Sequence, residues 1–182
     1  WWKYLLAVLV VGASGVIFMG ISTYKDAPPK PDYISPSGEE IVLKESVERG
    51  QLVFQRYALM EYGSMFGDGA ARGPDFTAEA LHHVAVEMND YYGKQVANGN
   101  VDELSQIEKD GISVRVKREL KANRYDRERN TVVLTEGQTY AAGRLVEYYS
   151  SKFKGDHKEA FKPVGYITDD AELKDLSAFF FW

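Results

Sequence analysis

The sequence predicts a mainly helical protein with an N-terminal helix that crosses a membrane and a small amount of β structure. Three observations lead to this prediction. The run Tyr4–Ser22 contains no charged residue. Apolar residues in the remainder recur at helical spacing, and only short β-branched runs interrupt them. Four of the six prolines lie together within residues 25–37. A chain of 182 residues has room for one domain besides the anchor.

The composition excludes several classes of function. The net charge is −5, and no basic stripe interleaved with aromatic residues is present, which argues against a nucleic-acid partner. The chain has no cysteine. Disulfides, thiolate metal sites and thiol catalysis are therefore excluded, and so is the covalent haem attachment that requires C-x-x-C-H.

The uncharged N-terminal run is long enough for a retained membrane span over residues 1–24. A hydrocarbon core of about 30 Å needs about 20 apolar helical residues, whereas a signal peptide has a shorter apolar core and a small-residue cleavage site. Aromatic residues at both ends of the run fit an interfacial belt: Trp1, Trp2, Tyr4 and Tyr24. We expect the N-terminus in the cytoplasm and the main domain on the other side.

The segment after the span is expected to be a linker over residues 25–37, because clustered prolines favour an extended, semi-rigid chain. A domain over residues 38–168 follows. It is expected to open with a short strand at Glu40–Lys44 and a helix at Glu45–Met60, whose apolar side contains Val47, Leu52, Val53 and Phe54.

A glycine-rich turn comes next and is the most unusual local feature. Its glycines are Gly63, Gly67, Gly69 and Gly73. So many glycines close together indicate a backbone that approaches another group closely. Asp68 and Asp75 flank the turn, and could bind a cation or cap the turn; the capping role is favoured. Thr77 is expected to cap the next helix, which would have Glu79 in its first turn and run to Val96.

The second half of the domain is predicted to be two helices around a strand. A charged helix is expected over Asp102–Ala122, with a buried side formed by Ile107, Ile112, Val116 and Leu120. A strand at Thr131–Leu134 precedes a helix that Thr135 caps and that reaches Phe153. Thr168 is expected to cap the terminal helix.

The C-terminal residues 169–182 end in the apolar run FFFW. They fit either a docked amphipathic helix or the start of a second membrane helix. We favour the membrane helix, because soluble domains rarely finish in such a run without a polar tail.

Only one cluster has the residue types of a metal site. Glu79, His83 and Glu87 are spaced i, i+4 on one helix face, and His82 is adjacent. Two-metal helical bundles need a second Glu-x-x-His, but the one remaining histidine, His157, is in a loop. A solvated polar face is therefore favoured, and no catalytic residue is predicted in the chain.

Two motifs carry a resemblance to a known family. They are GQLVFQRYALMEYGS…GDG…GPDFTAEAL at Gly50–Leu81, and NRYD followed by TVVLTEGQTY at Asn123–Tyr140. Together with the terminal FFFW, they resemble the N-terminal region of quinol-dependent nitric oxide reductase, a single-chain bacterial membrane enzyme. The resemblance covers essentially the whole chain.

A more distant resemblance links the same stretch to the cytochrome c subunit of two-subunit nitric oxide reductases. The cysteines of its C-x-x-C-H motif correspond here to Leu59 and Tyr62, and the histidine to Gly63. The resemblance therefore implies a cytochrome c-like helical domain without haem, with apolar bulk in its place. Electrons would come from a membrane quinol.

The resemblance also implies partners and cofactors. The catalytic core would be a bundle of membrane helices, in the same polypeptide or in a separate subunit. It would hold haem b, a high-spin haem and a non-haem iron, where two NO become N2O. The chain would be an accessory part on the periplasmic side of the inner membrane, with partners that include lipid and, through the core, quinol.

In this family the glycine turn lies over the haem propionates and helps to hold a calcium ion. The positions that match are the backbone at Gly69 and Ala71. Relatives usually carry tyrosine at the position of Ala71, so this departure weakens the expected calcium contact. Arg72 is expected either to pair with a propionate or to be a solvated arginine.

Two alternatives stay open. One is a divergent relative such as a nitric oxide dismutase, with the same architecture and altered chemistry. The other is an independent single-pass binding or sensor domain.

Overall fold

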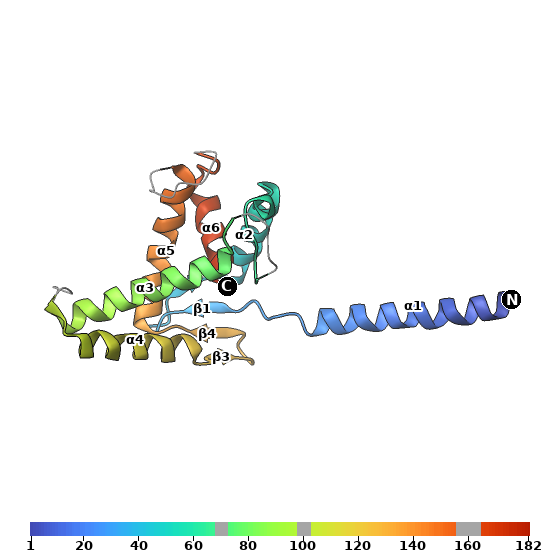
Figure 1. Cartoon of the computed structure of the whole chain (residues 1–182), viewed down its shortest axis with the longest axis horizontal. Coiled ribbons are helices and arrows are strands. Elements are labelled where there is room, and N and C mark those ends of the chain that lie inside the picture. Colours follow the sequence, from blue (N-terminus) through green and yellow to red (C-terminus); the bar gives the residue numbers. More distant parts are fainter. Residues whose placement is uncertain (68–72, 98–102, 156–164) are drawn as a thin grey trace.

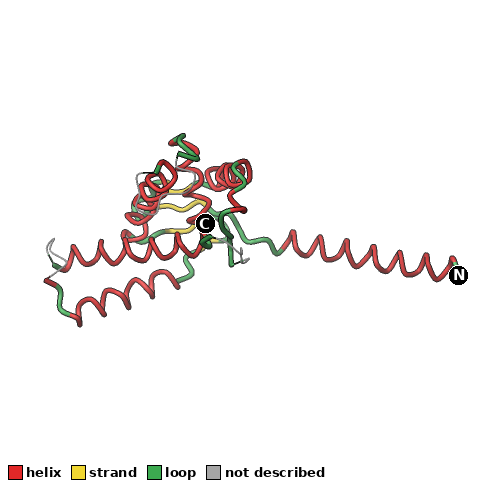
Figure 2. Tube along the Cα trace, turned by 45° about the horizontal axis from the view of Figure 1, so that its top comes forward, coloured by secondary structure: helices red, strands yellow, loops and turns green. Residues whose placement is uncertain are grey.

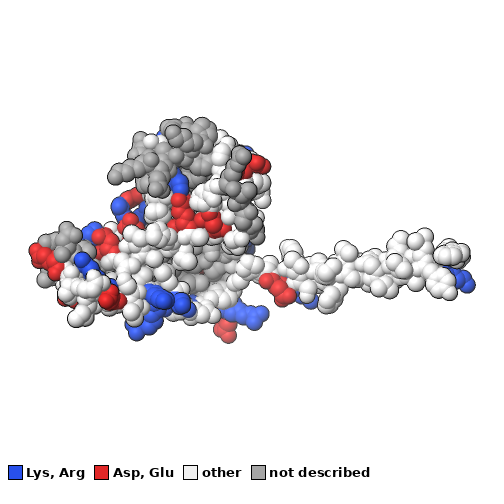
Figure 3. Space-filling model, viewed as in Figure 1, with Lys and Arg blue, Asp and Glu red and all other residues white. Residues whose placement is uncertain are grey.

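A computed structural model of the chain describes residues 1–67, 73–97, 103–155 and 165–182. Helix α1 (Trp2–Lys25) extends away from the rest of the protein, and none of its residues is buried (Figure 1). Its surface carries charged side chains only near its two ends (Figure 3). Among the described residues it is the one helix long and apolar enough to cross a membrane. The structure thus contains the helix that the sequence predicts for a span.

A small four-stranded sheet lies beside the exit of α1. Its strands are β1 (Asp32–Ile34), β2 (Glu40–Val42), β3 (Tyr125–Asp126) and β4 (Thr131–Val133), in the order β2-β1-β4-β3. The central pair β1–β4 is parallel, with Tyr33 opposite Val132, and the outer pairs are antiparallel. Strand β1 falls within the segment expected to be a linker, so the extended spacer is shorter than predicted.

The helices pack around one core. They are α2 (Lys44–Arg56), the short 3-10 helix η1 (Leu59–Glu61), α3 (Phe76–Val96), α4 (Gln106–Lys121), α5 (Glu136–Lys154) and α6 (Asp170–Phe181). In Figure 2 the short strands lie among the helices, and the pair α3–α4 extends to one side. The mainly helical fold with minor β structure is therefore confirmed. The four-stranded sheet as a whole was not predicted, because its strands are only two or three residues long.

Helices α2 and α6 cross at very short range. A Cβ atom on Gly50 would lie 2.0 Å from the carbonyl oxygen of Asp175, so only glycine fits the crossing. Ion pairs flank it: Arg49 pairs with Asp175 and Arg56 with Glu172, each at 2.7 Å. The close approach explains why α6 is held firmly in the domain.

The aromatic end of α6 belongs to this core. Phe179 and Phe180 are buried, whereas Phe181 and Trp182 are half-buried. The docked-helix alternative therefore describes Asp170–Phe181 within the structure. A membrane helix that starts in residues 169–182 remains a prediction.

Several predicted helix starts need correction. Asp75, not Thr77, caps α3, and Asp169, not Thr168, caps α6; each carboxylate accepts a bond from a backbone N–H three residues on. The carboxylates are the stronger acceptors in both pairs. Thr135 caps α5 as predicted, through a reciprocal pair of bonds with Gln138.

The charged helix α4 also differs from the prediction. It begins at Gln106, where Ser105 and Glu108 form a capping box. Ile107 is 84% exposed, so it does not belong to the buried side. Ile112 and Val116 are buried as predicted, Leu120 is partly buried against the core, and Glu119 joins them.

Candidate functional site

The glycine turn is a loop whose two arms are joined at the base. The backbone N–H of Ser64 donates to Pro74 at 2.9 Å, and that of Phe76 donates to Ser64 at 2.9 Å. Residues 68–72 lie outside the described part of the chain. The predicted site residues Gly69, Ala71 and Arg72, and also Asp68, all fall there.

Asp75 fixes the geometry of this base. One carboxylate oxygen accepts bonds from Gly67 N–H (2.6 Å) and Ser64 Oγ (2.9 Å), and the other from Thr77 Oγ1 (2.5 Å) and Ala78 N–H (2.9 Å). Partial burial alone would raise the pKa of this carboxyl, but the four hydrogen bonds lower it well below its ordinary value. Asp75 therefore caps the turn and α3, which is the favoured alternative of the sequence analysis.

Phe66 lies on the first arm of the turn, after Ser64, and has an unusual backbone conformation. Its φ of +56° lies in the left-handed region that favours glycine. Its N–H donates to Thr77 Oγ1 at 3.0 Å. Phe66 is 58% exposed, and its ring packs edge-on against Trp182, with ring centroids 5.5 Å apart.

The segment that leaves α1 meets the end of α6 at the same place. The indole N–H of Trp182 donates to the carbonyl of Pro29 at 2.9 Å. Lys30 Nζ lies 5.6 Å from the centre of the Trp182 ring and donates to Gln51 Oε1 at 3.0 Å. The exit of the apolar helix, the C-terminal residues and the glycine turn therefore converge on one side of the domain.

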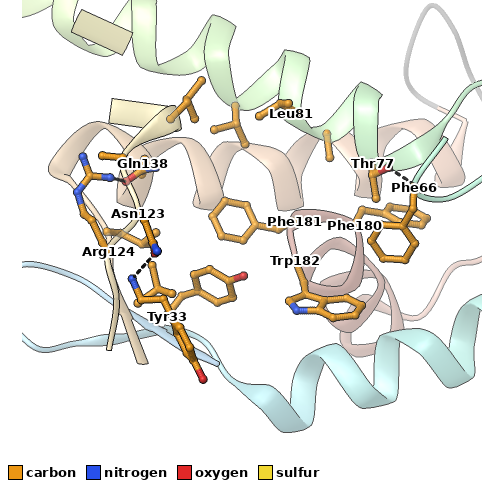
Figure 4. A pocket seen from close by; sticks show the side chains of 17 residues that line it. Tyr33, Phe66, Thr77, Leu81, Asn123, Arg124, Gln138, Phe180, Phe181 and Trp182 are labelled. Atoms are coloured by element: carbon orange, nitrogen blue, oxygen red, sulfur yellow. Dashed lines mark hydrogen bonds between the residues drawn. The ribbon is translucent and has the colours of Figure 1, made fainter. Parts of the chain in front are cut away.

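A cavity of about 410 Å³ opens beside this convergence. Leu81 and Thr77 of α3 lie along one side, Phe181 and Trp182 face it from α6, and Arg124 lies at the opposite end (Figure 4). Its lining is mainly apolar and includes Tyr33, Phe66, Ala80, Val84, Val132, Leu134 and Phe180. A second hollow of about 430 Å³ shares Tyr33, Phe66 and Trp182 with it and reaches Pro28, Pro29 and Pro31. The two hollows thus form one groove that begins where α1 ends.

Arg124 is the cation of this groove. Its Nη1 donates to the backbone carbonyl of Glu119 at 2.8 Å and to Gln138 Oε1 at 3.3 Å. Both acceptors are neutral. In the described part of the chain no carboxylate forms an ion pair with this guanidinium.

The position that corresponds to a haem histidine has no room for a side chain. A Cβ atom on Gly63 would lie 2.5 Å from Pro74 O and 2.6 Å from Cε2 of Phe76. The Phe76 ring is fully buried and stacks on Phe180, with centroids 4.7 Å apart and planes within 4°. Leu59, at a cysteine position, is also fully buried. The residues present therefore do not fit a haem of the cytochrome c type.

The polar face of α3 is engaged with α5. Glu79 forms an ion pair with the nearly buried Lys152 and accepts a bond from Tyr148 at 2.9 Å. Glu87 pairs with Arg144 at 3.3 Å. The His83 ring lies against the Tyr148 ring, with ring centroids 3.7 Å apart. Among the described residues no three metal-ligating side chains come together. Helix pairing accounts for the two carboxylates of this face.

A buried polar network around Glu119 was missed in the sequence. Its carboxylate accepts bonds from Tyr92 OH and Thr135 Oγ1, each at 2.7 Å, and from Arg115 Nε at 2.9 Å. These bonds join α3, α4 and the start of α5. The available signal was the spacing of Glu119, which continues the row of Ile112 and Val116.

Comparison with protein families gives a match over most of the chain. A family model that describes the cytochrome c-like domain of the nitric oxide reductase protein NorB matches residues 31–182. A search of curated proteins returned no match. The matched segment contains the sheet, the described helices after α1, and the Phe66 and Trp182 side of the convergence described above.

Proposed function

Because this chain belongs to the family of the NorB cytochrome c-like domain of nitric oxide reductase, we propose that it is the accessory extracytoplasmic part of a quinol-dependent nitric oxide reductase. Membership implies a membrane core as partner and association with a membrane. The proposed role is to cover the extracytoplasmic end of that core, in the inner membrane, with the N-terminus of α1 in the cytoplasm.

One observation carries the proposal. The glycine turn, the exit of α1 and the end of α6 converge on one side, where Trp182 contacts both Phe66 and Pro29. A domain that covers a membrane core needs its membrane connections and its contact loop on the same side. A free sensor domain has no such requirement.

The filled haem position supports a quinol as electron donor. Phe76, which stacks on Phe180, occupies the space beside Gly63, so this position offers no haem to relay electrons from a soluble cytochrome. Electrons would then enter the core from within the membrane. Haem b, a high-spin haem and a non-haem iron would supply the chemistry in the core; this chain would contribute binding and exclusion of water.

We extend the proposal to calcium at the boundary with the core. The backbone at Gly69 and Ala71 would supply ligands, and Arg72 would face a haem propionate; all three lie outside the described residues. Asp75 supports this role indirectly, because it holds both arms of the turn. Ala71→Tyr is expected to strengthen calcium retention in the whole enzyme, measured by metal analysis after dialysis. Unchanged retention would contradict the placement of the loop.

The decisive experiment is purification of the native complex in detergent, followed by haem and metal analysis. Copurification with two b-type haems, iron and calcium is expected, and the complex should form N2O from NO with a quinol. Failure to form N2O by a haem-loaded complex would favour a dismutase-like relative. A chain that leaves its native membrane alone and colourless would instead indicate an independent binding or sensor domain.

A further inference from the structure

We propose that the groove beside Trp182 receives a protruding segment of the membrane core, in which an apolar side chain enters the cavity and an adjacent carboxylate pairs with Arg124. The proposal rests on the proposed function, since it assumes the core as partner. It extends the contact from Phe66 of the glycine turn to the groove beside it.

The groove continues the side on which the chain connects to the membrane. It runs from Pro28 and Pro29, just after α1, past Phe66 and Trp182 to the inner end at Arg124. A partner that contacts the glycine turn at Phe66 therefore reaches the groove without a gap. This continuity is the first argument for a protein partner.

The walls of the groove carry apolar side chains that the domain leaves uncovered. Leu81 is 57% exposed and Phe66 58% exposed, although both line the same cavity. Val84 and Phe180 form its buried floor. An apolar side chain seated there would remove Leu81 and Phe66 from water, which is favourable in proportion to the area covered.

The positive charge of Arg124, at the inner end of the groove, indicates that the partner segment also carries a carboxylate. Arg124 is half-buried and bonded to two neutral oxygens, although the chain carries a net charge of −5. A guanidinium in this setting matches a carboxylate in both charge and geometry. An acidic residue next to the apolar one would supply it.

The position of the groove relative to the membrane favours a protein segment over a lipid as its occupant. Acyl chains stay within a hydrocarbon layer of about 30 Å, and the apolar helix that would span it ends at Lys25. The groove begins at Pro28 and lies beyond that end. A loop on the outer face of the core can reach this level, whereas an acyl chain would have to leave the bilayer.

The absence of cysteine makes the test direct, because one introduced thiol is the only one in the chain. Leu81→Cys places it in the groove. Val114→Cys is the matched control, since Val114 is 67% exposed on α4 and does not line the groove. Labelling by a water-soluble maleimide would be quantified on this chain by mass spectrometry. Three states would be compared: the chain in detergent, the chain in lipid nanodiscs, and the assembled enzyme.

We expect the cysteine at position 81 to lose its labelling only in the assembled enzyme, while the control labels equally in all three states. Arg124→Glu should restore labelling in the enzyme, and Arg129→Glu, in the exposed turn between β3 and β4, should not. Phe66→Cys provides a second groove position if the first variant folds poorly.

Each other outcome overturns the proposal in a distinct way. Equal labelling in a complex that still contains haem and iron would place the core elsewhere and leave the proposed function intact. Protection already in nanodiscs would assign the groove to a lipid. Absence of any haem-containing complex would refute the proposed function and this contact with it.

Discussion

Asp75→Ala should open the base of the glycine turn. The substitution removes a carboxylate that accepts four hydrogen bonds, from Ser64, Gly67, Thr77 and Ala78. It leaves the apolar core untouched, because Asp75 itself is only half-buried. The change in stability therefore reports on the turn and on the first turn of α3.

The size of the effect follows from the bonds. Loss of an N-cap costs about 1 kcal/mol. Each of the other three bonds contributes about 0.5–1 kcal/mol, because the freed donors are partly exposed and can bind water. The free energy of unfolding should therefore fall by about 3 kcal/mol. For a chain of this size that corresponds to a decrease in Tm of about 6–12 °C.

The assay is thermal unfolding of the full chain in detergent, followed by circular dichroism. Asp169→Ala is the matched control, because Asp169 caps α6 through one backbone bond, to Glu172, and should cost only about 1 kcal/mol. Equal losses in the two variants would refute the reasoning. They would mean that Asp75 acts as an ordinary cap and that the turn is held by other contacts.

Three further predictions follow from the core. Gly63→Ala should destabilise the domain by about 2 kcal/mol or more through overpacking against Phe76, as measured by denaturant unfolding, and a neutral effect would contradict the filled haem position. Lys152→Met should cost about 3 kcal/mol by leaving Glu79 without its cation, and Lys152→Met with Glu79→Gln should recover most of the loss in a double-mutant cycle. Glu119→Gln should lower the free energy of unfolding at neutral pH. Burial alone would raise the Glu119 pKa, but its hydrogen bonds make that pKa lower in the folded than in the unfolded chain. The difference in stability between the variant and the unsubstituted chain should therefore shrink as the pH falls below the ordinary value of about 4.5. A difference independent of pH would exclude a charged Glu119.

The sequence was sufficient for elements that depend on local signals. Thr135 and Gln138 three residues later identify the start of α5, and the uncharged run identifies α1. The prediction of helix caps failed where two candidate residues lie close together, as with Asp75 and Thr77. Which of the two caps the helix depends on contacts with Ser64 and Gly67 across the turn.

The site was less accessible to sequence reasoning than the fold. The groove is assembled from residues far apart in the chain, such as Phe66, Leu81, Arg124 and Trp182. Periodicity describes single elements and carries no information on which surfaces meet. The position of β1 beside β4, separated by about a hundred residues, illustrates the same limit.

The bond between Trp182 and Pro29 joins positions 153 residues apart. The two ends of the domain therefore lie next to each other. Domains with adjacent ends can be inserted, exchanged or removed with little strain on what flanks them. The spacing between α1 and any segment that follows Trp182 is thus independent of what the domain contains. Residues 31–181 could therefore be exchanged for another domain with equally close ends without moving α1 relative to Trp182.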